Sequence, residues 1–363
     1  MKAIIYLEDG KSFNAQSSMD TERLGEVIIN TAVVGYQEMI TDPANAGKIL
    51  VLTYPLIGNY GIAAQFSESA KIWVSALAVK EKSRIYSHWQ AKESLDTFLK
   101  KGATPIIYNL DTRSLTVYLR DNGPLVGIIS TQEFETKKLA DKINKFKKQP
   151  AKSLFPEVSV KKVKISSKIK GVTIAVLDLG LTQGLIKQLE SLNFKLNIFP
   201  YYASGKEILA VKPKGLIISN GPENDPYLNT LAENISPLIG KLPILGVASG
   251  CQVLALALGA KLARLKFGHR GVNYPIARPG TFKGEITAQN HEYVIANNSL
   301  RKIKDLKVTA YNLNDHTIEE IESKKLKLIG VQYNPVTTGF CGVNEVLIKF
   351  SKLVKPAFRR AER

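Results

Sequence analysis

Residues 246–260 have the pattern on which many α/β enzymes mount a nucleophile. They read GVASGCQVLALALGA, which is a short apolar strand, a turn of small residues and then a helix. A reactive side chain at the tip of such a turn needs small neighbours, and Gly246 and Gly250 meet that need. The start of the helix supplies a backbone N–H that can stabilise an oxyanion. The residue at the tip is Ala248, however, and its methyl group cannot attack a substrate.

Cys251 is the side chain that could replace a nucleophile at this turn. It follows Ala248 by three residues, which on a helix is a rotation of about 300° and a rise of ~4.5 Å. A displaced nucleophile at Cys251 would need His269 or His291 as its base. We expect a structural role instead, because a thiol buried among apolar side chains has a raised pKa and is inert. The second cysteine, Cys341, is expected to be a small apolar residue of a loop or helix start.

The second half of the chain alternates strand and helix patterns regularly. Strands are expected at 172–180, 194–200, 215–221 and 242–248, and helices at 183–192, 227–239 and 249–260. Strands that are apolar throughout and separated by helices predict a parallel sheet with both faces covered. Such sheets bind ligands at the carboxyl ends of their strands. The turns after Asp178, Ser219 and Val247 are therefore the expected places for chemistry.

The first 150 residues mix short strand and helix patterns, which indicates a separate α+β domain. A lysine-rich stretch follows, with about a dozen lysines in 137–170 and a predicted helix at 135–148. We therefore divide the chain into a first domain at 1–150, a lysine-rich linker at 151–170 and a parallel-sheet domain at 171–363.

Length and composition predict a soluble globular protein. The 363 residues, 44% of them hydrophobic, are enough for two domains. No apolar run reaches the ~18 residues of a membrane span, and the two cysteines fit a reducing compartment, so a cytoplasmic location is expected. The formal charge of +18 gathers partly in the lysine-rich stretch, which has little aromatic interleaving. We expect a solvated basic face or a dock for an acidic protein rather than nucleic-acid binding, and no cluster suggests a metal.

Several motifs together resemble the small-subunit family of carbamoyl-phosphate synthase, whose second domain is a class I glutamine amidotransferase. In the second domain they are GVASGCQVLALALGAK, LKFGHRGVNYP, ITAQNHEYVIA and GVQYNPV. In the first domain they are GEVIINTAVVGYQEMITDP, LTYPLIGNYG and LDTRSLTVYLR. The resemblance implies an α/β protein in which an α+β domain of small-subunit type precedes a glutamine amidotransferase-like parallel-sheet domain.

The resemblance also implies that the catalytic triad of this family is missing here. The family's nucleophilic Cys, its His base and the Glu that orients the His fall on Ala248, Asn334 and Val336. Asn is neutral and cannot take a proton at pH 7, and Val cannot orient a base by hydrogen bonding.

Glutamine contacts of the family fall on residues that are only partly of the expected type. The positions carried over as a vestigial glutamine site are Gly221, Ser249, Gln252, Asn290 and Tyr293. Glu223 and Asn224 replace one glycine of the family's loop, and Glu292 replaces another glycine. A carboxylate beside a developing oxyanion would oppose catalysis, so glutamine is expected to bind weakly at most. Ala44 and Thr182 depart from the family's Ser and Lys.

The function implied by the resemblance is that of a subunit. Family members hydrolyse glutamine and pass ammonia to a large synthetase subunit that uses bicarbonate and ATP to make carbamoyl phosphate for pyrimidines and arginine. This chain is expected to pair with that large subunit without hydrolysing glutamine, to hold no cofactor itself, and to leave ATP and magnesium to the large subunit. Two alternatives remain: an active glutaminase that uses Cys251, or a regulatory pseudoenzyme with another partner.

Overall fold

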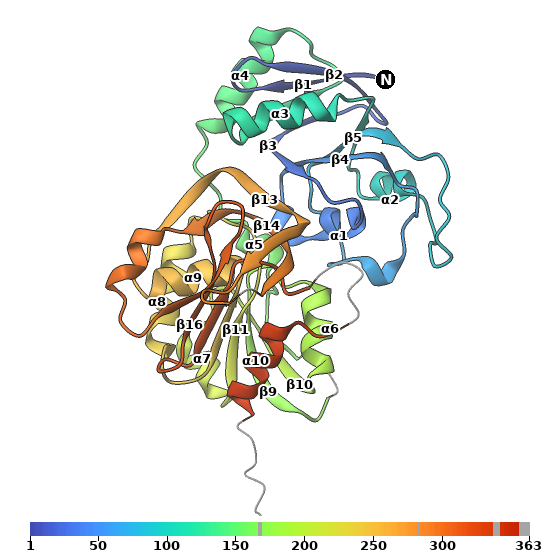
Figure 1. The fold of residues 1–363 in the computed structure, drawn as a ribbon. Helices are drawn as coiled ribbons and strands as arrows, with labels where there is room; N and C mark the ends of the chain where they lie inside the picture. The colour runs from blue at the N-terminus through green and yellow to red at the C-terminus, as the bar shows by residue number, and fades with distance from the viewer. Residues whose placement is uncertain (166–168, 282, 337–341, 356–363) are drawn as a thin grey trace, which may run out of the picture. The chain divides into compact units, whose positions relative to one another are not determined.

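The computed structural model describes residues 1–165, 169–281, 283–336 and 342–355, which leaves Cys341 outside the described residues. The chain divides into two compact units (Figure 1). The barrel unit consists of Met1–Lys152 together with Lys266–Gly271, and the sheet unit of Ser153–Leu265 together with Val272–Arg363. Among the described residues, no helix combines the length and apolar character that crossing a membrane requires.

Seven strands of the barrel unit form a closed barrel in the order β1-β2-β6-β5-β4-β3-β7. The strands are β1 (Lys2–Leu7), β2 (Ser12–Ser17), β3 (Glu22–Asn30), β4 (Ile49–Ile57), β5 (Ala76–Lys82), β6 (Ile106–Tyr108) and β7 (Leu125–Ser130). Alternate residues of every strand, such as Ile5 and Leu7 of β1, meet in one buried apolar cluster. This alternation follows from the two-residue period of a strand, which sends successive side chains to opposite sides of the barrel wall.

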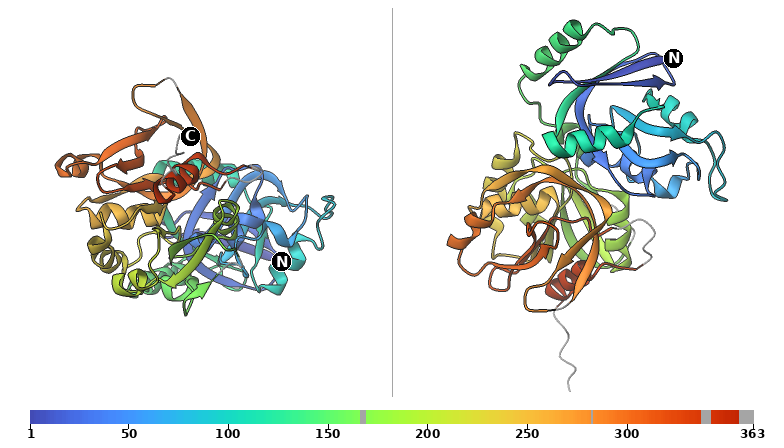
Figure 2. Two further views of the ribbon diagram at one scale, coloured as in Figure 1. Left: turned by 90° about the horizontal axis from the view of Figure 1, so that it is seen from below. Right: turned by 45° about the horizontal axis from the view of Figure 1, so that its top comes forward.

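Helices cover the barrel from several sides. They are α1 (Tyr36–Thr41), α2 (Leu95–Lys101), α3 (Thr112–Asn122) and α4 (Thr136–Lys147), with short 3-10 turns η1 (Pro43–Asn45) and η2 (Ala64–Phe66). The helix predicted at 135–148 is confirmed as α4, which buries Leu139 and Ile143 against β1 and β7 (Figure 2, right). Lysines on its other positions are partly paired, because Lys142 binds the carboxylate of Glu22 and Lys147 binds that of Glu8.

The sheet unit contains a ten-stranded sheet in the order β14-β13-β15-β16-β17-β12-β11-β9-β10-β8. Its strands are β8 (Lys164–Ile165), β9 (Val172–Asp178), β10 (Phe194–Pro200), β11 (Gly215–Ile218), β12 (Ile244–Val247), β13 (Leu262–Ala277), β14 (Gly284–Ile295), β15 (Lys307–Asn312), β16 (Ile318–Ser323) and β17 (Leu328–Val331). Strands β10, β9, β11, β12 and β17 run parallel as neighbours, which confirms the predicted parallel sheet.

Both faces of the parallel strands are covered by helices. The helices are α5 (Phe155–Val158), α6 (Gln183–Ser191), α7 (Gly205–Ala210), α8 (Leu228–Ile235), α9 (Ser249–Ala257) and α10 (Glu345–Val354), with 3-10 turns η3 (Ser236–Leu238) and η4 (Asn297–Lys302). Along β9, Ile174 and Val176 pack in the cluster of α6 and α10, whereas Ala175 and Leu177 pack in the cluster of α7, α8 and α9. The helix predicted at 227–239 ends earlier, at Ile235, because Pro237 lacks the N–H that would continue it.

Candidate functional site

The turn between β12 and α9 has the predicted elbow form. Ala248 lies at its tip with φ 50° and ψ −114°, a conformation that L-residues rarely adopt. Its N–H donates to the carbonyl of Val331 on β17 at 2.7 Å, and its carbonyl accepts from the N–H of Cys251 at 2.9 Å. The turn is therefore fixed on one side by the neighbouring strand and on the other by the first turn of α9.

Close backbone packing explains why both glycines flank the tip. A Cβ on Gly250 would lie 2.1 Å from the carbonyl oxygen of Ile218, and one on Gly246 would lie 2.6 Å from that of Gly250. Neither position can hold a side chain unless the backbone moves. These distances support the steric argument made from the sequence.

The three expected triad positions lie at the carboxyl ends of two adjacent parallel strands. Val247 of β12 pairs with Val331 of β17, so Ala248 and the segment that carries Asn334 and Val336 follow neighbouring strands. The amide oxygen of Asn334 accepts from the N–H of Val336 at 3.0 Å, which closes a local turn. Ala248 and Val336 both pack against the apolar cluster of α6 and α10. The three positions at which the resemblance expects a nucleophile, its base and the group that orients the base thus hold Ala248, Asn334 and Val336.

Four of the five carried-over substrate residues form two hydrogen-bonded pairs. The hydroxyl of Ser249 donates to the carbonyl of Gly221 at 3.1 Å, and the amide nitrogen of Gln252 donates to the carbonyl of Tyr293 at 3.1 Å. Asn290 lies three residues before Tyr293 on β14 and is half-buried. The structure therefore gathers the first turn of α9, the loop after β11 and strand β14 around one place.

The side chain of Glu223 lies between α9 and β14 and bonds to both. Its carboxylate accepts from the Gln252 amide nitrogen at 2.5 Å, from the N–H of Glu292 at 2.8 Å and from the N–H of Tyr293 at 3.3 Å. The sequence indicated that a carboxylate would lie near the site but not what would bind it. Its backbone partners are 69 and 70 residues away along the chain, and no local pattern reports such a contact.

Glu292 carries a second carboxylate beside the first. It is 3% exposed and pairs with the guanidinium of Arg264 at 3.1 Å. The same guanidinium lies 5.8 Å from the centre of the Tyr293 ring. Arg264 thus compensates the charge of Glu292 and covers Tyr293 from the strand β13.

Cys251 lies in an environment that opposes thiolate formation. It is fully buried in a cluster with Ala255, Ile295 and Ile321. Burial raises the pKa of its thiol far above the ordinary range, and the neighbouring carboxylates of Glu319 and Glu320 raise that pKa further.

The histidines considered as bases for Cys251 are both buried. His291 is fully buried, and its Nε2 lies 3.9 Å from a carboxylate oxygen of Glu319. His269 belongs to the segment Lys266–Gly271, which is grouped with the barrel unit.

The two remaining departures from the family pattern, Ala44 and Thr182, lie at the starts of a 3-10 turn and of a helix. Ala44 lies in η1, where its N–H donates to the carboxylate of Asp42 at 2.9 Å. Thr182 is the N-cap residue of α6 and is buried.

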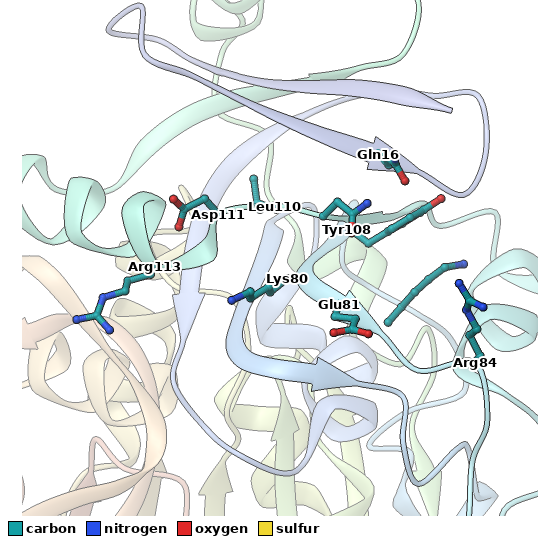
Figure 3. A pocket seen from close by; sticks show the side chains of 10 residues that line it. Gln16, Lys80, Glu81, Arg84, Tyr108, Leu110, Asp111 and Arg113 are labelled. Carbon is teal, nitrogen blue, oxygen red and sulfur yellow. The ribbon is translucent and has the colours of Figure 1, made fainter.

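A separate pocket of about 830 Å³ lies in the barrel unit. Figure 3 shows Arg113 at the start of α3 and Arg84 on the segment after β5, with Lys80 and Glu81 on β5. Its lining mixes basic and acidic groups, and one of the lysines, Lys82, is paired with Asp96 at 2.5 Å.

The parallel sheet and its elbow define the class of the sheet unit. Residues 175–342 match the family model of class I glutamine amidotransferases, and residues 5–129 match that of the carbamoyl-phosphate synthase small chain, CPSase domain. The chain is therefore a two-domain protein of small-chain type with an amidotransferase domain.

Curated relatives agree with both matches over nearly the whole chain. A carbamoyl phosphate synthase small chain of Caldanaerobacter subterraneus is 39% identical and covers 99% of this chain and 98% of its own. A small chain of Aquifex aeolicus is 36% identical, covering 98% of each. A pyrimidine-specific small chain of Halalkalibacterium halodurans is 37% identical, covering 99% of each. This chain belongs to the carbamoyl phosphate synthase small chain family.

Proposed function

We propose that the chain is a small subunit that pairs with a large synthetase subunit in carbamoyl phosphate formation and does not itself hydrolyse glutamine. The observation that carries the proposal is Ala248, whose methyl group stands at the tip of the elbow and packs against the same apolar cluster as Val336. Loss of such a nucleophile costs on the order of 10⁶ in rate, so only binding and oxyanion contacts would remain.

The other parts of the proposal follow from the family. Ammonia would come from free ammonium or another donor, while ATP and magnesium would act on the large subunit. The complex would serve pyrimidine or arginine synthesis in the cytoplasm, and the relatives' names support the pairing in general. The burial of Cys251 and the carboxylates around it argue against a displaced nucleophile at that position.

Ammonia release tests the proposal directly. The chain is co-expressed with the large subunit of the same organism, and ammonia from glutamine is measured for the wild type and for Cys251→Ala. We expect co-purification, no release from either sample, and carbamoyl phosphate synthesis that depends on added ammonium.

Three results would contradict the proposal in different ways. Release that Cys251→Ala abolishes, while its thermal unfolding is unchanged, would place the nucleophile at Cys251. Release that survives the substitution would mean that another group performs the hydrolysis. Failure to co-purify would remove the pairing and favour a pseudoenzyme with another partner.

A further inference from the structure

We propose that Glu223 is a built-in occupant of the amino-acid site: its carboxylate fills the position of a free amino acid's carboxylate and keeps such a ligand out. The inference rests on the proposed function, because it explains why a chain without a nucleophile would also not hold glutamine. It concerns ligand binding and can be tested without any catalysis.

The groups around Glu223 form a cradle for an anion. Two consecutive backbone N–H groups, of Glu292 and Tyr293, and the amide nitrogen of Gln252 all donate to its two carboxylate oxygens. Successive N–H groups that point to one place are a common anion-binding arrangement in proteins. Hydrogen bonds to an ionised acceptor are also stronger than those between neutral groups.

The cradle is rigid, and the Gln252 side-chain amide has a fixed orientation within it. Gln252 is fully buried, and its amide nitrogen donates both to Glu223 and to the carbonyl of Tyr293. Both partners can only accept, so the nitrogen must face them and the site presents a donor to its occupant. Gln332, also buried, donates to the same Tyr293 carbonyl at 2.9 Å and holds that part of β14 in place.

The donors identify the class of ligand that would replace Glu223. Gln252 and Tyr293 are two of the residues that the family resemblance assigns to glutamine. Glutamine carries one carboxylate, and the cradle holds one carboxylate, so the Glu223 side chain takes the place of the α-carboxylate of an amino acid. As a tethered group it competes at an effective concentration of mM or above, which a free ligand must overcome.

The loop that carries Glu223 is anchored at both ends. A Cβ on Gly221 would lie 1.8 Å from the carbonyl oxygen of Leu179, so this residue is packed directly on the turn after β9. On the other side, Asp225 accepts from the N–H of Leu154 at 2.7 Å and from that of Tyr227 at 2.9 Å. Between the anchors, Asn224 is exposed with φ 53°. This loop therefore presents Glu223 to the cradle rather than to solvent.

Calorimetric titration of the full-length chain with L-glutamine tests the inference. We expect Glu223→Gly to bind L-glutamine at least tenfold more tightly than the wild type, because the internal competitor is gone. L-Glutaminamide, which lacks the free carboxylate, should not bind the variant. Asn224→Gly is the matched control, since it adds a glycine to the same loop and leaves the carboxylate, and it should behave like the wild type.

Further variants keep the test decisive. If Glu223→Gly does not fold, Glu223→Gln keeps the side-chain volume but loses the anion, and it should also bind more tightly than the wild type. If Glu223→Gly folds without binding, Glu223→Gly with Asn224 deleted restores the family's loop length, and its failure to bind would overturn the inference. Measurable binding by Glu223→Gly that is no tighter than that by Asn224→Gly would overturn it as well. The proposed function fails separately, through ammonia release by the wild type.

Discussion

Ala248 has the strained backbone of an elbow tip although its side chain is only a methyl group. A non-glycine residue in a sparsely populated region of φ and ψ costs about 1 to 3 kcal/mol, and it persists only when its surroundings over-determine it. Here the surroundings are the hydrogen bond to Val331 on β17 and the carbonyl that starts α9. The conformation is fixed by the packing of sheet and helix, so it does not depend on a reactive side chain at the tip.

Glu38 on α1 is a single residue whose ionisation should affect stability. Burial raises the pKa of its carboxyl to about 7, and the nearby carboxylate of Glu68 contributes in the same direction. Because the folded state then binds more protons than the unfolded state, stability is fully present below the ordinary pKa of 4.5 and falls as the pH rises to about 7.

The substitution Glu38→Gln removes this dependence. Between pH 5 and pH 8 the wild type should lose about 1 to 2 kcal/mol more unfolding free energy than the variant. Both tryptophans, Trp73 and Trp89, lie in the barrel unit, so urea unfolding followed by their fluorescence reports on this unit. Glu233→Gln, at an exposed position of α8, is the control and should keep the wild-type profile. Equal pH profiles for all three chains would refute the assignment to Glu38.

At the scale of elements, the junction of β11, β12 and α9 depends on glycine. Gly250→Ala would push a methyl group against the Ile218 carbonyl at 2.1 Å, and that atom is fixed in the sheet. We expect the variant to lose at least ~3 kcal/mol of unfolding free energy in urea melts followed by circular dichroism. Gly284→Ala is the control, because its nearest atom is 3.4 Å away and its φ is ordinary, and it should change stability by less than ~1 kcal/mol. Equal effects of the two substitutions would contradict the steric argument.

The same elements show which features the sequence could predict. Strands β9, β11 and β12 contain continuous apolar runs and β10 is mostly apolar, and the small residues at 246–250 predict the elbow, because these signals are local. Barrel closure depends on pairings such as β3 with β7 and β2 with β6, which join distant segments and leave no mark in any short pattern. The contact of Glu223 with β14 was missed for the same reason.

At the scale of the molecule, the net charge is +18, and some lysines of the lysine-rich stretch are paired with carboxylates. Lys138 pairs with Glu135 at 2.8 Å, and Lys142 and Lys147 bind carboxylates of β3 and of the residue after β1. Exposed ion pairs of this kind are weak, so the expectation that nucleic acid is not the ligand rests on the scarcity of aromatic residues among these lysines.

Salt dependence checks this expectation. Binding of the chain to a labelled DNA duplex should be detectable only at low ionic strength and should vanish by ~150 mM salt, because non-specific binding rests on counterion release. Fluorescence anisotropy at increasing salt concentration measures it. A micromolar or tighter complex that survives at ~150 mM salt would show that the basic surface is a nucleic-acid site.

The strand β13 has a consequence for how the protein is made. Its residues Lys266–Gly271 belong to the barrel unit, where Phe267 packs against the barrel core and the Arg270 carbonyl accepts from the N–H of Thr31 at 3.3 Å. The barrel unit is therefore not contiguous in the chain, and a chain that stops at Lys152 lacks part of it. During translation the ribosome must synthesise more than a hundred further residues, about half of the sheet unit, before the first unit can be completed.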